Sequence, residues 1–185
     1  MTIDDAQADI RRAFVGGGPG AIVSALVWLF AAFVHSRSGV SGAFIALFFG
    51  GFLIFPVSLL LSRYVFGRST MAKGNPLGLL ALESTIAMIG CLIAAWLLLK
   101  PYPGFAFPVA AIAVGTHYLA FKTAYGDRTY WLLGALLTMI GVCGIYYLPG
   151  RTSLVILAVA ATELAFGMAL LVRALKEARA SVTAT

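Results

Sequence analysis

The chain consists mainly of long apolar stretches separated by short polar connections. Six stretches have about the 20 predominantly apolar residues that a helix needs to cross a bilayer. They run over residues 18–35, 41–62, 77–99, 105–121, 130–148 and 152–172. Asn75 and Pro76 are suited to the N-cap and first turn of the third segment. The pattern predicts an all-α fold, an integral membrane six-helix bundle.

Composition agrees with this prediction. Hydrophobic residues make up 61% of the 185 residues and charged residues 11%, against about 45–50% and about 25% in soluble domains. The net charge is +6, but the basic residues stand singly between apolar stretches. We therefore expect the lipid bilayer, and no nucleic acid, as the partner of this surface.

The distribution of Lys and Arg predicts the orientation. Ten of the 13 basic residues fall on one side of a six-span threading and three on the other. The three are Arg37, Lys100 and Arg151. By the positive-inside rule both termini are expected in the cytoplasm, with the protein in the inner (plasma) membrane as a multi-pass protein. Tyr125 and Tyr130 are expected in the inner aromatic belt.

Three parts of the chain are distinguished. Residues 1–15 have the spacing of an amphipathic helix, capped by Thr2, that lies on the membrane interface. Residues 16–173 are expected to form the six-helix transmembrane domain, and residues 174–185 a cytoplasmic C-terminal tail. Small residues at helical spacing (Ala161, Ala165 and Ala169) favour close packing of the last span.

Three titratable residues lie inside predicted spans: Glu83, His117 and Glu163. Such groups are costly in hydrocarbon unless they are paired or hydrated. At about 1.5 Å per residue they lie about 8–15 Å from the cytoplasmic ends of their helices. The third and fourth spans form a short hairpin, so Glu83 and His117 are expected to meet, with Glu163 as a third member of the site.

The surroundings of these groups extend the hypothesis. Ser84 and Tyr118 offer hydroxyl groups beside them, and Lys122 lies nearer the cytoplasmic mouth. The alternative is that the polar groups only staple helices together. No metal-ligand spacing, nucleophile motif or phosphate-binding loop is present, so no catalytic residue, metal or cofactor is expected.

Four segments carry a resemblance: "GGGPG", "FFGGFLIFP", "GRSTMAKGNPLGLLALES" and "GTHYLAFKTAYGDRTYWLLGALL". In this order they resemble a family of small bacterial multi-helix inner-membrane proteins of unknown function. The resemblance covers residues 16–137. It implies a bacterial membrane protein and carries no activity across.

The leading functional hypothesis is a small membrane transporter or channel with a protonatable intramembrane site. It is expected to form a homo-oligomer and to bind a small molecule or ion, and proton coupling is the mechanism proposed for it. A second hypothesis is a membrane-embedded enzyme or lipid-binding protein. A third is a non-catalytic accessory or assembly subunit of the membrane.

Overall fold

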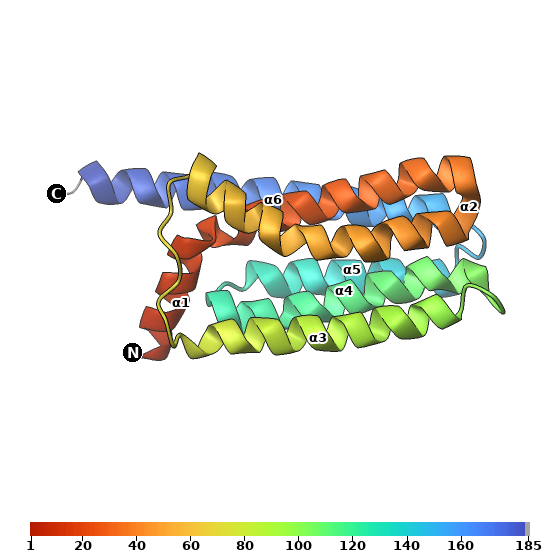
Figure 1. Cartoon of the computed structure of the whole chain (residues 1–185), viewed down its shortest axis with the longest axis horizontal. Helices are drawn as coiled ribbons and strands as arrows, with labels where there is room; N and C mark the ends of the chain where they lie inside the picture. The colour runs from red at the N-terminus through yellow and green to blue at the C-terminus, as the bar shows by residue number, and fades with distance from the viewer. Residues whose placement is uncertain (184–185) are drawn as a thin grey trace.

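The computed structural model describes residues 1–183, which are helical with short connections and contain no strand. The elements are α1 (Ile3–Ala13), η1 (Val15–Gly17), α2 (Gly18–Leu60), η2 (Leu61–Val65), α3 (Pro76–Leu97), α4 (Pro103–Tyr125), α5 (Thr129–Tyr146) and α6 (Thr152–Thr183). The long helices lie side by side along one axis, and α1 crosses one end of them (Figure 1).

Within residues 1–183, five helical stretches are long and apolar enough to cross a membrane. The first of them covers two predicted spans, because α2 continues through the expected connection. It bends at Gly39, whose φ of 71° and ψ of −169° lie outside the helical region. In Figure 1 the two halves of α2 fold back beside each other from this point. Glycine adopts such a conformation without a steric penalty from Cβ.

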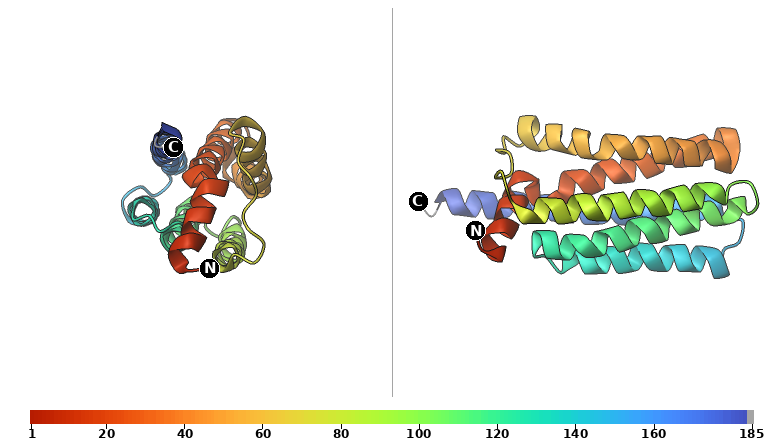
Figure 2. Two further views of the ribbon diagram at one scale, coloured as in Figure 1. Left: turned by 90° about the vertical axis from the view of Figure 1, so that its left-hand side faces the viewer. Right: turned by 60° about the horizontal axis from the view of Figure 1, so that its bottom comes forward.

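The helices form two close pairs, α4 with α5 and α2 with α6, and α3 packs mainly against α4 at the edge of the bundle (Figure 2). Rings from α2 and α4 fill the core. The centroid of Phe107 lies 5.9 Å from that of Trp28 and 5.6 Å from that of Phe44.

Glycines allow the close approach in both pairs. A Cβ atom at Gly115 would lie 2.8 Å from the carbonyl oxygen of Gly134, and one at Gly167 would lie 2.9 Å from the amide nitrogen of Ile22. The expected contact through Ala161, Ala165 and Ala169 is wrong, because all three are exposed. The last helix approaches α2 at Gly167 instead.

The outside of the bundle is apolar. Phe30, Phe49, Leu82 and Leu132 are each more than half exposed. A surface of this kind is typical of contact with lipid rather than water. Together with the long apolar helices it indicates a membrane protein.

Two predicted caps are confirmed. The Asp5 amide donates to the Thr2 hydroxyl at 3.2 Å at the start of α1, and the Leu77 amide donates to Asn75 Oδ1 at 3.1 Å at the start of α3. The last helix extends well beyond the predicted span, to Thr183. The final two residues of the predicted tail lie outside the described residues.

Candidate functional site

A carboxyl group lies in the middle of the bundle. Glu163 on α6 is 0% exposed, and its Oε1 accepts a hydrogen bond of 3.0 Å from the Tyr118 hydroxyl on α4. The buried Ser24 hydroxyl on α2 interacts with the same carboxyl group. Glu163 Oε2 has no hydrogen-bond partner among the described residues. Three helices thus enclose a carboxyl group whose hydrogen bonding is incomplete, which is an energetically expensive arrangement.

A chain of tyrosines leads from this carboxyl group to one end of the bundle. The ring of Tyr118 stacks on that of Tyr130 at 6.2 Å between centroids, and Tyr130 lies 5.0 Å from Tyr125. The Tyr130 hydroxyl donates to the carbonyl oxygen of Gly16 at 2.7 Å. A Cβ atom at Gly17 would collide with the same hydroxyl, and Gly17 also has a φ of 80°. Only glycine fits there.

The predicted role of Tyr125 and Tyr130 in an aromatic belt is wrong. Both side chains are buried, at 7% and 1% exposed respectively, and they belong to the interior of the bundle. An aromatic belt residue places its polar end in the interface, whereas Tyr130 uses its hydroxyl to hold the start of α2.

A pocket of about 880 Å³ opens beyond these tyrosines at the end of the bundle where α1 lies. Gly16 and Tyr125 line it, so its wall is continuous with the tyrosine chain. Five arginines also line it: Arg11, Arg12, Arg68, Arg128 and Arg173. The α4–α5 connection contributes Arg128, and α6 contributes Arg173. The pocket is strongly basic.

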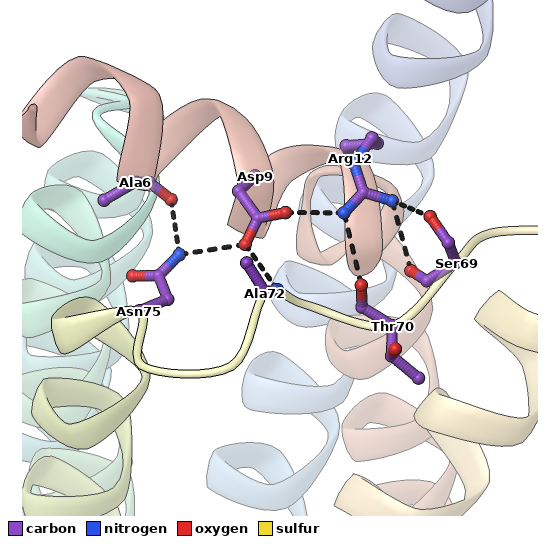
Figure 3. Close-up of polar contacts among 7 residues, drawn as sticks. All are labelled: Ala6, Asp9, Arg12, Ser69, Thr70, Ala72 and Asn75. Atoms are coloured by element: carbon purple, nitrogen blue, oxygen red, sulfur yellow. Dashed lines mark hydrogen bonds and ion pairs between the residues drawn. The ribbon is translucent and has the colours of Figure 1, made fainter. Parts of the chain in front are cut away.

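The α1 helix closes one side of this region by binding the α2–α3 connection (Figure 3). Asp9 accepts hydrogen bonds from the Ala72 amide at 2.8 Å and from Asn75 Nδ2 at 3.1 Å. The guanidinium group of Arg12 pairs with Asp9 and donates to the Thr70 carbonyl at 3.2 Å. Burial alone would raise the pKa of Asp9, but these donors outweigh it and hold the pKa below its ordinary value.

His117 does not meet Glu83 as expected. Its Nδ1 lies 2.7 Å from the Ser84 hydroxyl, one residue along α3, and its ring packs edge-on against Phe121 at 4.5 Å. Glu83 is exposed on the outer face of α3. A turn of about 100° per residue separates neighbouring side chains on a helix, so only one of Ser84 and Glu83 faces α4.

The other predicted groups lie apart from Glu163. Lys122 is half-buried, with its ammonium group 5.0 Å from the centroid of the Trp131 ring, a cation–π contact. It is not among the residues that line the basic pocket. Two pairs of predicted site residues are in hydrogen-bond contact in the structure: Tyr118 with Glu163, and Ser84 with His117.

The arrangement suits proton exchange at Glu163 and anion binding at the arginines. Within residues 1–183 no three His, Cys, Asp or Glu side chains are grouped closely enough to hold a metal ion. Ser24 and Arg68 were not predicted as site residues from the sequence. Ser24 is an ordinary hydroxyl residue in an apolar span, and Arg68 is one of the ten basic residues that predict only the orientation.

The segments that carry the resemblance to an uncharacterised family lie within residues 16–137. No curated protein and no solved structure matches the chain. A family model matches residues 3–173, which includes all of α1 and continues past Leu137 into α6. The resemblance to an uncharacterised family is therefore confirmed over a longer range. The chain belongs to the family of unknown function DUF7010.

Proposed function

We propose that this protein is a small proton-coupled membrane transporter whose proton-carrying group is Glu163. The observation that carries the proposal is the fully buried Glu163 carboxyl with one unpaired oxygen. Ionisable groups inside membrane spans are expensive and commonly mark ion or proton pathways. The chain of tyrosines from the basic pocket to Glu163 supplies a route of approach.

The proposal includes a threading. The two halves of α2 cross the membrane separately, which gives six spans in total. The membrane is the inner (plasma) membrane, and both termini lie on its cytoplasmic side. In support, α1, the α2–α3 connection and the C-terminal part of α6 gather at one end of the bundle (Figure 1). That end holds the five arginines of the pocket, as the positive-inside rule requires of a cytoplasmic face.

The proposed cycle uses the two states of the carboxyl group. Protonated Glu163 is neutral and tolerates a dry bundle, whereas the carboxylate needs donors or water. Tyr118 already supplies one donor. Loss of the proton therefore favours a conformation that opens toward water, and solute movement is coupled to this change. The Ser84–His117 pair adjoins Tyr118 on α4 and is the second polar contact of the proposed site.

The competing hypothesis is an accessory subunit in which the polar groups only join helices. The hydrogen bond between Tyr118 and Glu163 favours it, because this bond ties α4 to α6. The two hypotheses differ in what a Glu163→Gln variant loses. An amide keeps the shape and an acceptor, so a staple survives, whereas a proton carrier is inactivated.

The test uses proteoliposomes that contain a pH-sensitive dye. Phosphate, sulfate, acetate, amino acids and sugars are added outside in turn, and proton movement is recorded. At least one solute should move protons with the wild type, and Glu163→Gln should abolish the movement. Glu83→Gln is the matched control and should retain it. Wild-type vesicles that behave like empty ones with every solute, or an active Glu163→Gln variant, would contradict the proposal.

The proposal also includes a homo-oligomer joined through α3. This helix contacts the rest of the chain mainly through α4, and its outer face presents Glu83 among exposed leucine and isoleucine side chains. A carboxyl group that faces lipid is costly, and a second copy would cover it. Cys91 is exposed on the same helix. A bifunctional maleimide should therefore yield a dimer in membranes, and Cys91→Ser should prevent it.

A further inference from the structure

The excess of arginines in the basic pocket has no role in the proposed proton transfer at Glu163. Five arginines line it, against two acidic residues, Asp127 and Glu177. The arginines come from α1, the α2–α3 connection, the α4–α5 connection and α6. A folded chain that brings together so many like charges from distant segments loses stability through their repulsion. An anion that bound there would relieve this repulsion.

Two of these arginines have free hydrogen-bonding capacity. Arg12 and Arg173 form ion pairs with Asp9 and Asp127. Arg128 is exposed and takes part in neither pair. Arg68 has a buried Nε atom without a hydrogen-bond partner among the described residues. A buried donor left unpaired costs free energy, and a ligand oxygen would satisfy it.

The pocket has an apolar part as well. Val15, Leu170 and Ala174 lie on its wall together with the ring of Tyr125. Its volume of about 880 Å³ is within the range of small-molecule sites, about 300–1,000 Å³. The site therefore accommodates a charged head and part of an apolar body.

We propose that this pocket binds a phosphate group, carried either by an anionic phospholipid or by a soluble phosphorylated molecule. Arginine forks match phosphate oxygens in geometry and charge. Basic pockets at the cytoplasmic ends of membrane helices are suited to anionic headgroups. The inference concerns binding alone and does not rest on proton transfer at Glu163.

The test measures thermal unfolding of the whole chain in a neutral detergent. One arm titrates sodium phosphate against sodium chloride at equal ionic strength. The other titrates dioctanoyl-phosphatidylglycerol against dioctanoyl-phosphatidylcholine. A ligand that binds only the folded state raises the melting temperature with its concentration. A rise with phosphatidylglycerol alone identifies a lipid headgroup, a rise with phosphate alone identifies a soluble ligand, and both rises identify a site for either.

The matched variants separate the pocket from general charge. Arg68→Gln/Arg128→Gln removes the two arginines with free capacity, and Arg63→Gln/Arg151→Gln removes two exposed arginines elsewhere. Each lost charge-assisted hydrogen bond should weaken binding about tenfold, so the pocket variant should bind roughly 100-fold more weakly. The control variant should bind as the wild type does.

Two results would overturn the inference. One is a wild type whose melting temperature responds to neither phosphate nor phosphatidylglycerol beyond their controls. The other is equal weakening in both double variants, since this would show a nonspecific charge effect. Should the glutamine variant fail to fold, Arg68→Lys/Arg128→Lys replaces it. This variant keeps the charge but loses the fork geometry, and several-fold weaker binding is then expected.

Discussion

The close contact between α4 and α5 at Gly115 predicts that a larger residue at this position destabilises the fold. A Cβ atom there would lie 2.7 Å from the Thr138 amide nitrogen and 2.8 Å from the Gly134 carbonyl oxygen. Both neighbours are backbone atoms of α5, so no side-chain rotation relieves the collision. Gly115→Ala therefore forces the two helices apart, and the seam loses dispersion contacts along its length.

The expected magnitude follows from two opposing terms. Overpacking costs about 1–3 kcal/mol, and the rigid neighbours place this site near the upper value. The higher helix propensity of alanine offsets about 1 kcal/mol of this cost. The net loss is about 2 kcal/mol of unfolding free energy, or roughly a 30-fold shift of the equilibrium.

Gly90→Ala is the matched control. Gly90 lies on α3, and a Cβ atom there has nothing within 4 Å. This variant should be neutral or up to about 1 kcal/mol more stable. The assay is reversible unfolding in mixed micelles of dodecyl maltoside and dodecyl sulfate, followed by tryptophan fluorescence. If Gly115→Ala is as stable as Gly90→Ala, close backbone packing does not hold α4 against α5.

Three further predictions concern other parts of the chain. Tyr118→Phe removes the hydrogen bond to Glu163 and should cost about 1–3 kcal/mol in the same unfolding assay; a smaller loss in a Glu163→Leu background would confirm the coupling, and equal losses would refute it. Gly39→Ala should cost about 1–3 kcal/mol through its backbone conformation alone, because nothing lies within 4 Å of its Cβ position; an unchanged stability would contradict the bend. Asp9→Ala should release the α2–α3 connection, so that a spin label at Lys73 in a cysteine-free background becomes more mobile. In the chain with Asp9 intact, this mobility should appear only on acidification. The pKa of Asp9 lies below its ordinary value of 3.8, so the contacts of the Asp9 carboxylate stabilise the fold above pH 3.8 and are lost as the pH falls through the lowered pKa. Release of the connection at neutral pH in this chain would refute the prediction.

The local features of the fold were predictable because they depend on neighbouring residues. Thr2 and Asn75 cap the helices that follow them, since an N-cap acts on amides two or three residues away. Two predicted spans, 105–121 and 152–172, were shorter than the corresponding helices α4 and α6 of the structure. Hydropathy ends where polar residues begin, whereas α6 continues to Thr183 because a helix can extend into water.

The candidate site was predictable only in part. Glu163 stood out as a carboxyl group in an apolar span, and the structure buries it. Tyr118 was predicted as a hydroxyl residue of the site, but its pairing with Glu163 was not, because the two residues are distant in sequence. The choice between Ser84 and Glu83 for contact with His117 depends on the rotation of α3 about its axis. Apolar residues cover every other face of α3 on both sides of Glu83, Ser84 and Thr85, so no periodic pattern defined that rotation.

The sequence by itself determined that the chain is helical and membrane-embedded, because length and apolarity of each segment are local quantities that the bilayer selects directly. Only the tertiary structure decided which faces of the helices meet. In lipid every apolar face is equally well solvated, so packing depends on close backbone approach at residues such as Gly115 and Gly167 and on hydrogen bonds between helices. The same non-local contacts gather five arginines from distant segments into one pocket.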